Sequence, residues 1–419
     1  MRQILDLHIH SKYSRACSKE LTLSNIDAAC RIKGIDIIGT GDFTYPAWFR
    51  SIISELIEIG DSGLYRHKKG KDEQIKFLLS AEVALIYKDN GKARRIHLVV
   101  HAPNIAAAEA LNNFLDKKYN IRSDGRPILG MSSPDFVKLC LSIHPHFLIY
   151  PAHIWTPWFS VFGSKSGFDT FEECFKDQTE NVFAYETGLS SDPQMNWRVS
   201  ALDKLTLLSN SDAHSLSNLG REANIFDLDK ISYEEIYKAI KNNDKKSFKG
   251  TIEFYPEEGM YHNDGHRTCK INLTPAETKA KQGICPVCHT PLVIGVANRV
   301  AELADRAEGY KPQEAPEYIK LIGLDKIIAE ASGVKSRSAK KVKIVYENMI
   351  SNLGNELEIL MNQPIERIKE MSGPVIAEAI KRVREGRLII KPGFDGQYGK
   401  IKIFNQDELK KNGEWRLLL

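Results

Sequence analysis

Residues 4–10 read Ile4-Leu-Asp-Leu-His-Ile-His10, a short apolar run that carries two histidines. Side chains along a β-strand alternate between its two faces, so His8 and His10 point the same way. Asp212 and His214 repeat this spacing in another run. Seven apolar runs in the first half of the chain contain or end in a metal-ligand residue type: residues 4–10, 35–42, 77–82, 96–100, 147–153, 182–186 and 205–214. Imidazole and carboxylate together bind Zn²⁺, Mn²⁺ or Fe²⁺, so this pattern predicts a metalloenzyme.

The length and composition fit a globular protein of two or three domains. The 419 residues are 42% hydrophobic and 27% charged. Lysine plus arginine exceed aspartate plus glutamate by 58 to 54, an excess too small to indicate nucleic acid by itself. We expect neither a signal peptide nor a membrane span, because no apolar stretch approaches roughly 18 residues. Three of the seven cysteines are clustered. We expect the others to be reduced, which predicts a cytoplasmic protein.

Residues 1–250 alternate strand-like runs with helix-like stretches such as residues 23–33. This alternation predicts an α/β fold with a parallel sheet, and seven such strands most economically close into a barrel. Functional groups of such barrels gather at the carboxyl ends of the strands, where the ligand types fall here. The basic segments 61–75 and 118–130 are expected to be loops on the same side. They either follow a phosphodiester backbone or only face solvent.

A compact Cys/His cluster follows in residues 251–295. Its four ligands form two pairs with two-residue gaps: His266, Cys269, Cys285 and Cys288. This spacing indicates a closed, tetrahedral, structural zinc site. His262 and His289 are spare candidates for the fourth position. The zinc either only stabilises a module too small for a core, or also presents neighbouring basic side chains to phosphates.

The rest of the chain reads mainly as helices. Helical spacing occurs in residues 300–306, 319–331 and 345–353. Gly373-Pro374 divides residues 364–386 into two helices, and residues 387–404 predict a β-hairpin with glycine-rich turns. The sequence thus predicts three parts: a barrel domain over residues 1–250, a zinc module over 251–295, and a mainly helical C-terminal domain with a terminal β-hairpin over 296–419.

Eight residues of the apolar runs are expected to bind metal ions in the barrel: His8, His10, Asp42, Glu82, His97, His153, Asp212 and His214. Four of them are expected to act in catalysis: His10, Glu82, Asp212 and His214. Glu186 is either a ligand or a hydrogen-bond partner of one, and His101 is expected to be a bystander. Clustered divalent cations activate water and stabilise charge on a phosphate, so phosphoester hydrolysis is the natural reaction. The sequence contains no Ser/His/Asp triad motif, Walker P-loop or dinucleotide fingerprint.

The motifs resemble those of the PHP (polymerase and histidinol phosphatase) superfamily. The resemblance rests on Asp-Leu-His-Ile-His-Ser at 6–11, on Glu82, His97 and His153, and on Ser-Asp-Ala-His at 211–214. It implies a distorted seven-stranded β/α barrel with a multi-metal phosphoesterase site. Gly41-Asp42 departs from the usual Asp-His pair, and Arg15 stands where an acid or histidine is common. These departures leave the number of ions open, and Arg15 is a candidate phosphate contact.

A closer resemblance, over essentially the whole chain, is to the endonuclease Q family within that superfamily. It is carried by long stretches: residues 38–44, 123–130, 185–197, 209–214, 219–224, 266–305 and 392–399. The resemblance implies a DNA repair endonuclease that hydrolyses the phosphodiester 5′ to uracil, hypoxanthine, xanthine or an abasic site and leaves a 3′-hydroxyl. It implies zinc as cofactor, with Mg²⁺ or Mn²⁺ as possible active-site ions. Flipping of the damaged base into a pocket between the barrel mouth and the later parts is expected.

Five residues are expected to contact DNA: Arg15, Trp48, Arg126, Trp155 and Arg221. Trp48 and Trp155 belong to a set of loop aromatics that stack on a base or only pack the loops, together with Tyr45, Phe49, Trp158 and Phe159. Basic residues of the helical part either bind phosphates or only solubilise the surface: Lys335, Arg337, Lys340, Lys341, Lys343, Lys381, Arg382 and Arg384. Residues 414–419 lack the glutamine and paired aromatics of a sliding-clamp motif, so no clamp partner is expected.

Three alternatives stay open. A small-molecule phosphatase of the same superfamily would use the same metals but would need no zinc module or basic loops. A DNA exonuclease would use the same chemistry at strand ends. A non-catalytic DNA-binding or helicase-associated adaptor is the alternative outside enzymes, and the near-complete ligand set argues against it.

Overall fold

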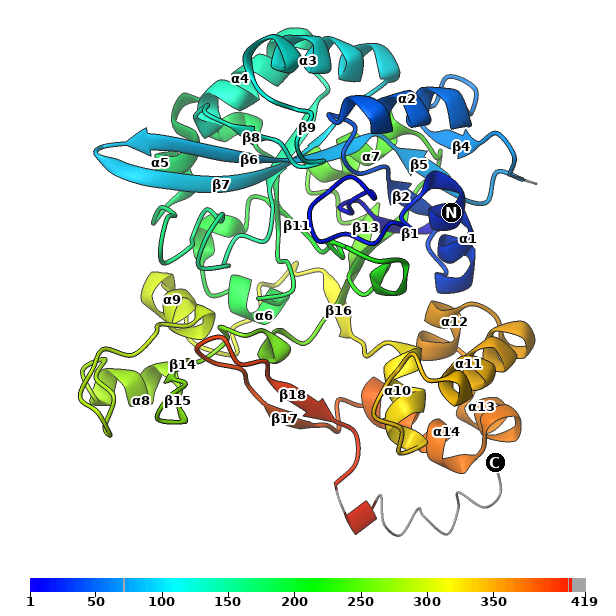
Figure 1. Cartoon of the computed structure of the whole chain (residues 1–419), viewed down its shortest axis with the longest axis vertical. Coiled ribbons are helices and arrows are strands. Elements are labelled where there is room, and N and C mark those ends of the chain that lie inside the picture. Colours follow the sequence, from blue (N-terminus) through cyan, green and yellow to red (C-terminus); the bar gives the residue numbers. More distant parts are fainter. Residues whose placement is uncertain (71, 406, 409–419) are drawn as a thin grey trace.

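The computed structural model describes residues 1–70, 72–405 and 407–408. It is a mixed α/β fold in which residues 1–255 form the largest body, with two smaller parts beneath it in Figure 1. The predicted α/β class is therefore confirmed. Each of the seven apolar runs contains a strand: β1 (Arg2–Asp6), β2 (Ile37–Gly39), β5 (Lys76–Leu78) continuing into β6 (Ser80–Asp89), β7 (Lys92–His101), β9 (Leu148–Pro151), β10 (Ala184–Glu186) and β11 (Thr206–Leu208).

The strands are distributed over several sheets. The largest has eight strands in the order β16-β13-β12-β1-β2-β5-β4-β3, the next has four in the order β8-β6-β7-β9, and β10 pairs with β11. The additional strands are β3 (Leu56–Glu58), β4 (Tyr65–His67), β8 (Ile128–Leu129), β12 (Ala223–Asp227), β13 (Phe248–Glu253) and β16 (Glu317–Lys320). Backbone hydrogen bonds join the sheets just beyond the strand ends, from Asp212 N to His8 O at 2.9 Å and from Ile154 N to Glu186 O at 3.1 Å.

The expectation of a purely parallel sheet is wrong. β1 is parallel to β2 but antiparallel to β12, and β7 is antiparallel to both β6 and β9. For β6 and β7, the cause lies in the two-residue turn Asn90-Gly91, whose φ angles are 49° and 76°. Positive φ at both positions fits the tight turn of a two-residue hairpin, so β6 leads directly back into β7 without a crossover helix.

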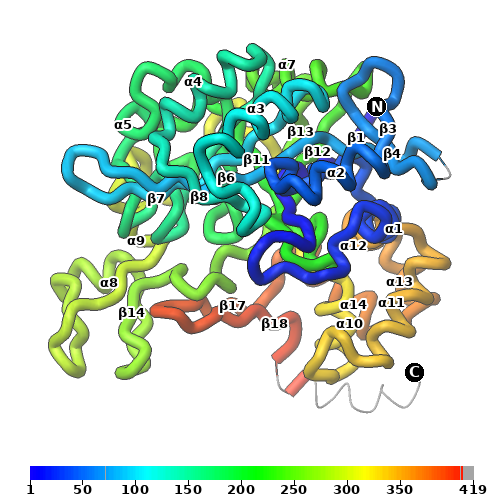
Figure 2. The backbone as a smooth tube through the Cα atoms, turned by 45° about the horizontal axis from the view of Figure 1, so that its top comes forward, coloured from blue at the N-terminus to red at the C-terminus, as the bar shows by residue number. Residues whose placement is uncertain are grey.

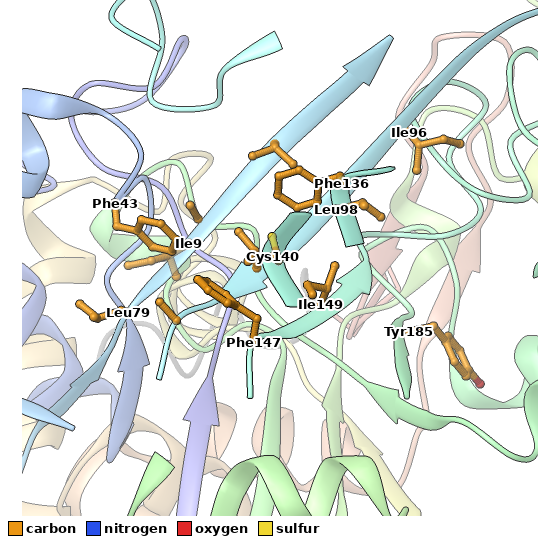
Figure 3. Packing of buried hydrophobic residues seen from close by; sticks show 14 of the residues in the cluster. Ile9, Phe43, Leu79, Ile96, Leu98, Phe136, Cys140, Phe147, Ile149 and Tyr185 are labelled. Carbon is orange, nitrogen blue, oxygen red and sulfur yellow. The ribbon is translucent and has the colours of Figure 1, made fainter. Parts of the chain in front are cut away.

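Helices cover the outside of this body: α1 (Leu23–Lys33), α2 (Pro46–Glu55), α3 (Ile105–Lys118), α4 (Ser133–Ile143), α5 (Phe171–Phe175), α6 (Pro193–Asn196) and α7 (Tyr233–Lys241). The helix predicted at residues 23–33 has these bounds because Thr22 caps its first turn and Gly34, at φ 90°, ends it. Their apolar faces pack on the strands, and Figure 3 shows part of that core around Phe136, Cys140 and Ile149.

The two smaller parts diverge from one another in both views (Figures 1 and 2). One contains β14 (Asp264–His266), β15 (Ile271–Leu273), α8 (Pro275–Ala280) and α9 (Val296–Leu303). The other is helical, with α10 (Leu324–Ala331), α11 (Lys340–Leu353), α12 (Glu356–Met361), α13 (Ile365–Ser372) and α14 (Pro374–Arg384). The predicted break at Gly373 is confirmed, whereas the predicted helix 319–331 begins only at Leu324, because residues 317–320 pair with β13 as β16.

The predicted terminal hairpin is confirmed as β17 (Ile389–Lys391) and β18 (Lys400–Lys402). Its turn docks on the segment before β14, where Gly393 N donates to Glu257 O at 2.9 Å and Gly399 N donates to Glu258 O at 3.0 Å. A Cβ on Gly399 would lie 1.9 Å from Glu257 O, so only glycine permits this approach. The C-terminal segment 414–419 lies outside the described residues. In the described part, no helix has the length and apolar character of a membrane span.

Candidate metal centre

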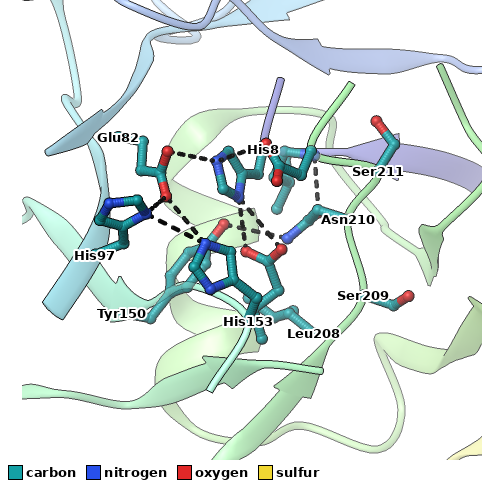
Figure 4. Close-up of polar contacts among 12 residues, drawn as sticks. His8, Glu82, His97, Tyr150, His153, Leu208, Ser209, Asn210 and Ser211 are labelled. Carbon is teal, nitrogen blue, oxygen red and sulfur yellow. Dashed lines mark hydrogen bonds and ion pairs between the residues drawn. The ribbon is translucent and has the colours of Figure 1, made fainter. Parts of the chain in front are cut away.

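Two groups of ligand atoms meet where the strand ends converge. One comprises His8, His10, Glu82 and Asp212, and the other comprises Glu82, His97 and His153. Within each group, the ligand atoms all lie within 4.8 Å of one another. Glu82 belongs to both, and Figure 4 shows it in contact with His8 of the first group and with His97 and His153 of the second. Its carboxylate therefore presents one oxygen to each group.

The first group surrounds Oε2 of Glu82. His10 Nε2 lies 3.2 Å from this oxygen and 3.0 Å from Asp212 Oδ1. His8 Nε2 lies 3.6 Å from the same glutamate oxygen and 3.8 Å from the same aspartate oxygen. Two imidazoles and two carboxylates thus point at one small volume, a ligand set that suits a divalent transition metal ion.

The second group surrounds Oε1 of Glu82. His97 Nδ1 lies 2.6 Å from this oxygen, and His153 Nε2 lies 3.2 Å from it. The two ring nitrogens are 3.3 Å apart. A carboxylate that serves two neighbouring ligand groups is the arrangement of two-metal phosphoesterase sites.

The donor atoms fit a bound cation better than they fit one another. Among the described residues, the buried atoms without a hydrogen-bond partner include His8 Nε2, His10 Nε2 and Asp212 Oδ1. Buried polar groups are normally paired, and unpaired ones cost free energy. Three such atoms directed at one point indicate a ligand that is itself a cation.

Two carboxylates hold these imidazoles from behind. Glu186 Oε2 lies 2.9 Å from His8 Nδ1, and Asp42 Oδ1 lies 3.0 Å from His10 Nδ1. The other oxygen of Asp42 accepts hydrogen bonds from Ser11 N, Ser11 Oγ and Ser14 Oγ at 2.7, 2.7 and 2.8 Å. Carboxylates in this position fix the tautomer that leaves the opposite ring nitrogen free for a metal. Asp42, expected as a ligand, thus contacts the back of His10 and lies outside both groups.

Two other histidines also lie outside the groups. His214, expected as a ligand and catalytic residue, packs its ring 4.7 Å from that of His10 and bonds through Nδ1 to the carbonyl of Asp212 at 2.8 Å. His101 is buried, and its Nε2 is 3.0 Å from the hydroxyl of Tyr150. Burial lowers the pKa of His101 to about 3, which fits the bystander expectation because a neutral ring needs no counter-ion.

The electrostatics reflect many carboxylates in a small volume. Burial alone would lower the pKa of His8, but the carboxylates of Glu186 and Glu82 raise it well above its usual range. Asp42 and Asp212 do the same for His10 against its burial. In the second group, burial lowers the pKa of His97 to about 4 despite Glu82. Without cations, the first group therefore retains protons that a metal ion would displace.

Backbone strain concentrates here. Asp42, His153 and Asp212 have φ angles of 48°, 32° and 45°, a left-handed region that non-glycine residues seldom adopt. Such conformations cost on the order of 1–3 kcal/mol and persist where the surrounding structure enforces them. The hydrogen bonds of Asp6 enforce one of them: its carboxylate accepts from Ser211 N at 3.0 Å and Gly220 N at 2.9 Å, which anchors the segment that carries Asp212.

Three of the expected DNA-contact residues are arginines beside the ligand groups. Arg126 Nη1 lies 2.9 Å from Glu82 Oε2, on the oxygen of the first group. Arg221 donates through Nε to the carbonyl of Ser211 at 2.9 Å. Arg15 is exposed, and its backbone N donates to Asp124 Oδ1 at 3.3 Å in the loop that carries Arg126. Two of the three guanidinium groups thus lie directly at the metal-ligand segment.

The expectation that Trp48 and Trp155 stack on DNA is wrong. Both are 1% exposed and belong to the hydrophobic core. Trp48 Nε1 donates to the carbonyl of Gly41 at 2.9 Å, and Trp155 Nε1 donates to Asn196 Oδ1 at 2.8 Å. Buried Trp with a satisfied N–H is a packing residue. Phe49 is also buried, whereas Trp158 is exposed beside Tyr261.

Two cavities open beside the ligand groups. The larger, about 1040 Å³, extends from Asp212 and His214 to the helical part. Its lining includes seven basic residues, Lys33, Arg221, Lys326, Lys335, Arg337, Lys400 and Lys402, and five acidic ones, Asp212, Glu258, Asp325, Glu330 and Glu356. The smaller, about 190 Å³, is lined by His153 and Asp212 on one side and by residues 256, 259–262 and 398 on the other. Tyr398 lines both cavities.

The Cys/His cluster is a separate site. The predicted four residues come together, with all ligand atoms of His266, Cys269, Cys285 and Cys288 within 4.8 Å of one another. His289 and His262 lie outside this group, and His262 lines the smaller cavity instead. Hydrogen bonds from Thr290 lower the pKa of the Cys288 thiol to about 6, so this side chain is readily available as a thiolate.

Sequence reasoning did not find Asp6, Ser11, Ser14 or Tyr398. Their side chains act through contacts that only the fold creates, although Asp6 and Ser11 belong to the 6–11 motif that contains the histidine pair. Tyr398 had a weaker signal, since it is an aromatic residue between two glycine-rich turns.

This fold and these two linked ligand groups define an α/β metal-centre protein. The chain is 31% identical to the lesion-specific endonuclease PfuEndoQ from Pyrococcus furiosus, whose crystal structure matches with a TM-score of 0.84 over 98% of this chain and 99% of that one. A structure of endonuclease Q with a 27-mer duplex carrying an abasic lesion at the active site matches equally, with a TM-score of 0.84, 31% identity and 98% of both chains covered. The chain belongs to the endonuclease Q family, which confirms the resemblance found in the sequence.

Two relatives of uncharacterised function also match. Protein YqxK of Bacillus subtilis is 30% identical over 95% of this chain and 98% of its own length. Protein MJ0043 of Methanocaldococcus jannaschii is 36% identical over 59% of this chain, which spans only 31% of that longer protein. The domain family described as MJ0043 C-terminal domain matches residues 323–387, within the helical part.

Proposed function

We propose that this protein is a DNA repair endonuclease that hydrolyses the phosphodiester 5′ to deaminated bases or abasic sites and leaves a 3′-hydroxyl. It is a metal-dependent phosphodiesterase by family. The observation that carries the proposal is the position of Glu82, which links two ligand groups at the end of a large cleft with basic lining. A phosphodiester backbone in that cleft would reach both groups.

The barrel metals would be held by His8, His10, Glu82 and Asp212 in one group and by Glu82, His97 and His153 in the other. Divalent cations such as Zn²⁺, Mg²⁺ or Mn²⁺ supply water activation and charge neutralisation when bound there. Asp42 and Glu186 orient the histidines, and the ring of His214 packs against that of His10. Asp212, Glu82, His10 and His214 remain the proposed catalytic set.

Arg126 has a separate role in this proposal. Its guanidinium lies on the metal-facing oxygen of Glu82, and this pairing, against partial burial, raises its pKa further. A guanidinium recognises two oxygens of a phosphate at once, so Arg126 would exchange Glu82 for the scissile phosphate. Arg221, which donates to the carbonyl of Ser211, and the exposed Arg15 would contact the neighbouring phosphates.

The cleft explains how DNA would bind without regard to sequence. Some of its basic residues are neutralised internally, as Lys33 is by Glu356 at 2.7 Å. Among the described residues, Arg221, Lys335, Lys400 and Lys402 form no ion pair. Other basic residues of the helical part have structural partners, since Arg384 donates to the carbonyls of residues 359, 360 and 363. The proposed phosphate contacts are therefore concentrated in the cleft rather than over the whole helical part.

The smaller cavity is the proposed receptor for the damaged base. Its volume of about 190 Å³ opens directly beside His153 and Asp212, so a base drawn out of the duplex would leave its 5′ phosphate at the metals. Unpaired polar atoms, including His262 Nδ1 and Ser190 Oγ, belong to its lining residues. They are candidate partners for the carbonyl groups that distinguish uracil, hypoxanthine and xanthine from the normal bases.

The Cys/His cluster is proposed to bind structural zinc, within the proposed module of residues 251–295 that follows a catalytic domain over 1–250 and precedes the C-terminal domain. The four ligands leave no open position for chemistry. A Cys285→Ser variant should become sensitive to limited proteolysis between residues 264 and 292 while barrel metal content is unchanged. Loss of metal from the barrel as well would contradict a separate module.

The test is incision of end-labelled duplexes that contain one uracil, hypoxanthine, xanthine or abasic site, or no lesion, with Mg²⁺, Mn²⁺ or Zn²⁺. We expect a single nick 5′ to the lesion, with no product from undamaged DNA or from an Asp212→Asn variant. A ladder of mononucleotides would instead indicate an exonuclease. Rapid hydrolysis of a small phosphate ester without DNA cleavage would indicate a phosphatase. DNA binding without any hydrolysis would indicate a non-catalytic adaptor.

A further inference from the structure

Tyr398 has the most exposed side chain among the exposed large hydrophobic residues that the structure describes, at 72%. It is also the aromatic residue that lines both cavities beside the metal ligands. Exposing an aromatic ring to water forgoes a large hydrophobic gain, and such rings are common where a binding partner covers them.

The backbone that carries Tyr398 is held firmly. Gly393, Gly396 and Gly399 donate backbone hydrogen bonds to the carbonyls of residues 257, 260 and 258 at 2.9, 3.0 and 3.0 Å. A Cβ on Gly393 would lie 2.2 Å from Gly259 O, so the turn is pressed against this segment. Arg267 N adds a hydrogen bond of 2.6 Å to Asp395 Oδ2. These contacts fix the position of the turn. A side chain that is to stay inserted between bases needs such a fixed backbone.

The position of the ring relates the two cavities to each other. The large cleft has more basic than acidic lining residues, which favours a phosphate backbone, and the small cavity is lined in part by His153 and Asp212. Tyr398 is at the junction of the two cavities with Leu189, Asp212 and Gly259, which also line both, and it is the aromatic side chain there. Extrusion leaves a gap in the base stack, and an aromatic side chain inserted there keeps the stack open.

We propose that Tyr398 is the wedge that occupies the place of the extruded base and stacks on the bases next to it. The inference rests on the proposed function, since it needs a duplex in the cleft and a base in the small cavity. Tyr398 is a positioning residue in this role, because it acts on the DNA stack and not on the scissile phosphate. The phenyl ring supplies the stacking, and the hydroxyl is dispensable.

The test compares incision of a uracil in a fully paired duplex with incision of the same uracil inside a three-base mismatch bubble. The bubble is already unstacked, so it needs no wedge. Base–aromatic stacking corresponds to about ten-fold to a hundred-fold in an equilibrium constant. We expect Tyr398→Ala to lose about that factor on the paired duplex and to stay within about three-fold of the wild type on the bubble. Tyr398→Phe should restore the paired-duplex rate.

Tyr310→Ala is the matched control. Tyr310 is also an exposed tyrosine, at 42%, but it lines neither cavity. We expect it to cleave both substrates as the wild type does.

Three results would overturn the wedge. Equal loss on both substrates would make Tyr398 a wall of the base pocket, no loss on either would leave it without a role, and failure of Tyr398→Phe would point to the hydroxyl. A wild-type enzyme that leaves both uracil substrates intact would instead overturn the proposed function. Intact incision by the wild type with any of the first three patterns would overturn the wedge alone.

Discussion

The Asp42→Asn substitution separates two roles that the sequence could not distinguish, metal ligand and orienting carboxylate. One oxygen of Asp42 accepts three hydrogen bonds, from Ser11 N, Ser11 Oγ and Ser14 Oγ. The asparagine must keep its carbonyl oxygen there, so its NH₂ group takes the place of the oxygen 3.0 Å from His10 Nδ1. Because the asparagine NH₂ group donates a hydrogen bond, His10 Nδ1 must accept it and can no longer carry the ring proton. The proton then lies on Nε2, the nitrogen that would bind the metal.

The expected magnitude follows from the loss of this orienting contact. Replacing such partners of metal-ligating histidines costs about 10- to 100-fold in metal affinity, or about 1.4–2.7 kcal/mol. A hydrogen bond to a charged group is worth about 1.5–3 kcal/mol, which agrees. We therefore expect Asp42→Asn to bind barrel metal 10- to 100-fold more weakly (about 2 kcal/mol) with the same number of ions at saturation.

Competition with a chromophoric chelator measures the affinity, and elemental analysis of the saturated protein measures the stoichiometry. Glu186→Gln is the matched control. Both oxygens of Glu186 lie near His8 Nδ1, at 3.2 and 2.9 Å, so a glutamine can present its carbonyl there and the loss should stay below about ten-fold. Loss of one ion per chain at saturation would make Asp42 a direct ligand and refute the argument, as would an unchanged affinity.

Other substitutions test the remaining parts of the site. Glu82→Gln removes the charge common to both groups, so it should lower metal content more than Asp212→Asn, which affects one group, and should reduce incision by about 1000-fold or more. Equal metal contents in the two variants would contradict a shared carboxylate. Lys335→Gln should weaken binding of damaged and undamaged DNA alike and reduce the slope of log K against log salt by about 0.9, whereas an unchanged slope would remove Lys335 from the interface. Burial raises the pKa of Glu253 from 4.5 to about 8, so between these pH values the carboxyl group is ionised in the unfolded chain but protonated in the folded protein. The free energy of unfolding should therefore fall as pH rises from 4.5 to 8. The melting temperature of Glu253→Gln should exceed that of the wild type by an amount that grows from about pH 5 to about pH 8. The exposed position Glu347 is the control, and Glu347→Gln should show no such growth. A difference in melting temperature that is independent of pH would refute the assignment.

The strand content was predictable because burial on both faces leaves a local trace. Each of the seven apolar runs that carry a ligand-type residue contains a strand, and the helix at residues 23–33 followed from its own capping and spacing. Strand direction was not equally visible. The Asn90-Gly91 dipeptide is typical of a hairpin turn, but the alternation of strands and helices elsewhere in the sequence favours a parallel sheet. Residues 317–320 read as helix because their pairing with β13 is a long-range contact.

The ligand set was predictable by residue type but not by position in the site. Six of the eight expected barrel ligands fall into the two groups, because imidazole and carboxylate at successive strand ends have few other uses. Asp42 and His214 differ from these six only in the direction of the side chain, which the local sequence pattern does not predict. The prediction that Trp48 and Trp155 contact DNA was wrong for the same reason. An aromatic residue after a strand points inward or outward according to the packing of the whole loop, and both of these point inward.

Glu82 and His97 differ from the other ligands in their support. Glu82 lies inside β6, opposite Val99 of β7, and His97 lies inside β7, whereas His8, His10, His153 and Asp212 lie in segments beyond the ends of their strands. A loop can absorb an inserted residue by bulging outward. In a strand, an insertion before position 82 shifts the pairing by one and turns the carboxylate to the opposite face of the sheet. Length variation during evolution is therefore open to the segments that carry His8, His10, His153 and Asp212, and closed to the hairpin that carries Glu82 and His97, so the spacing from Ser80 to Glu82 should be the least variable distance in lineages that descend from this chain.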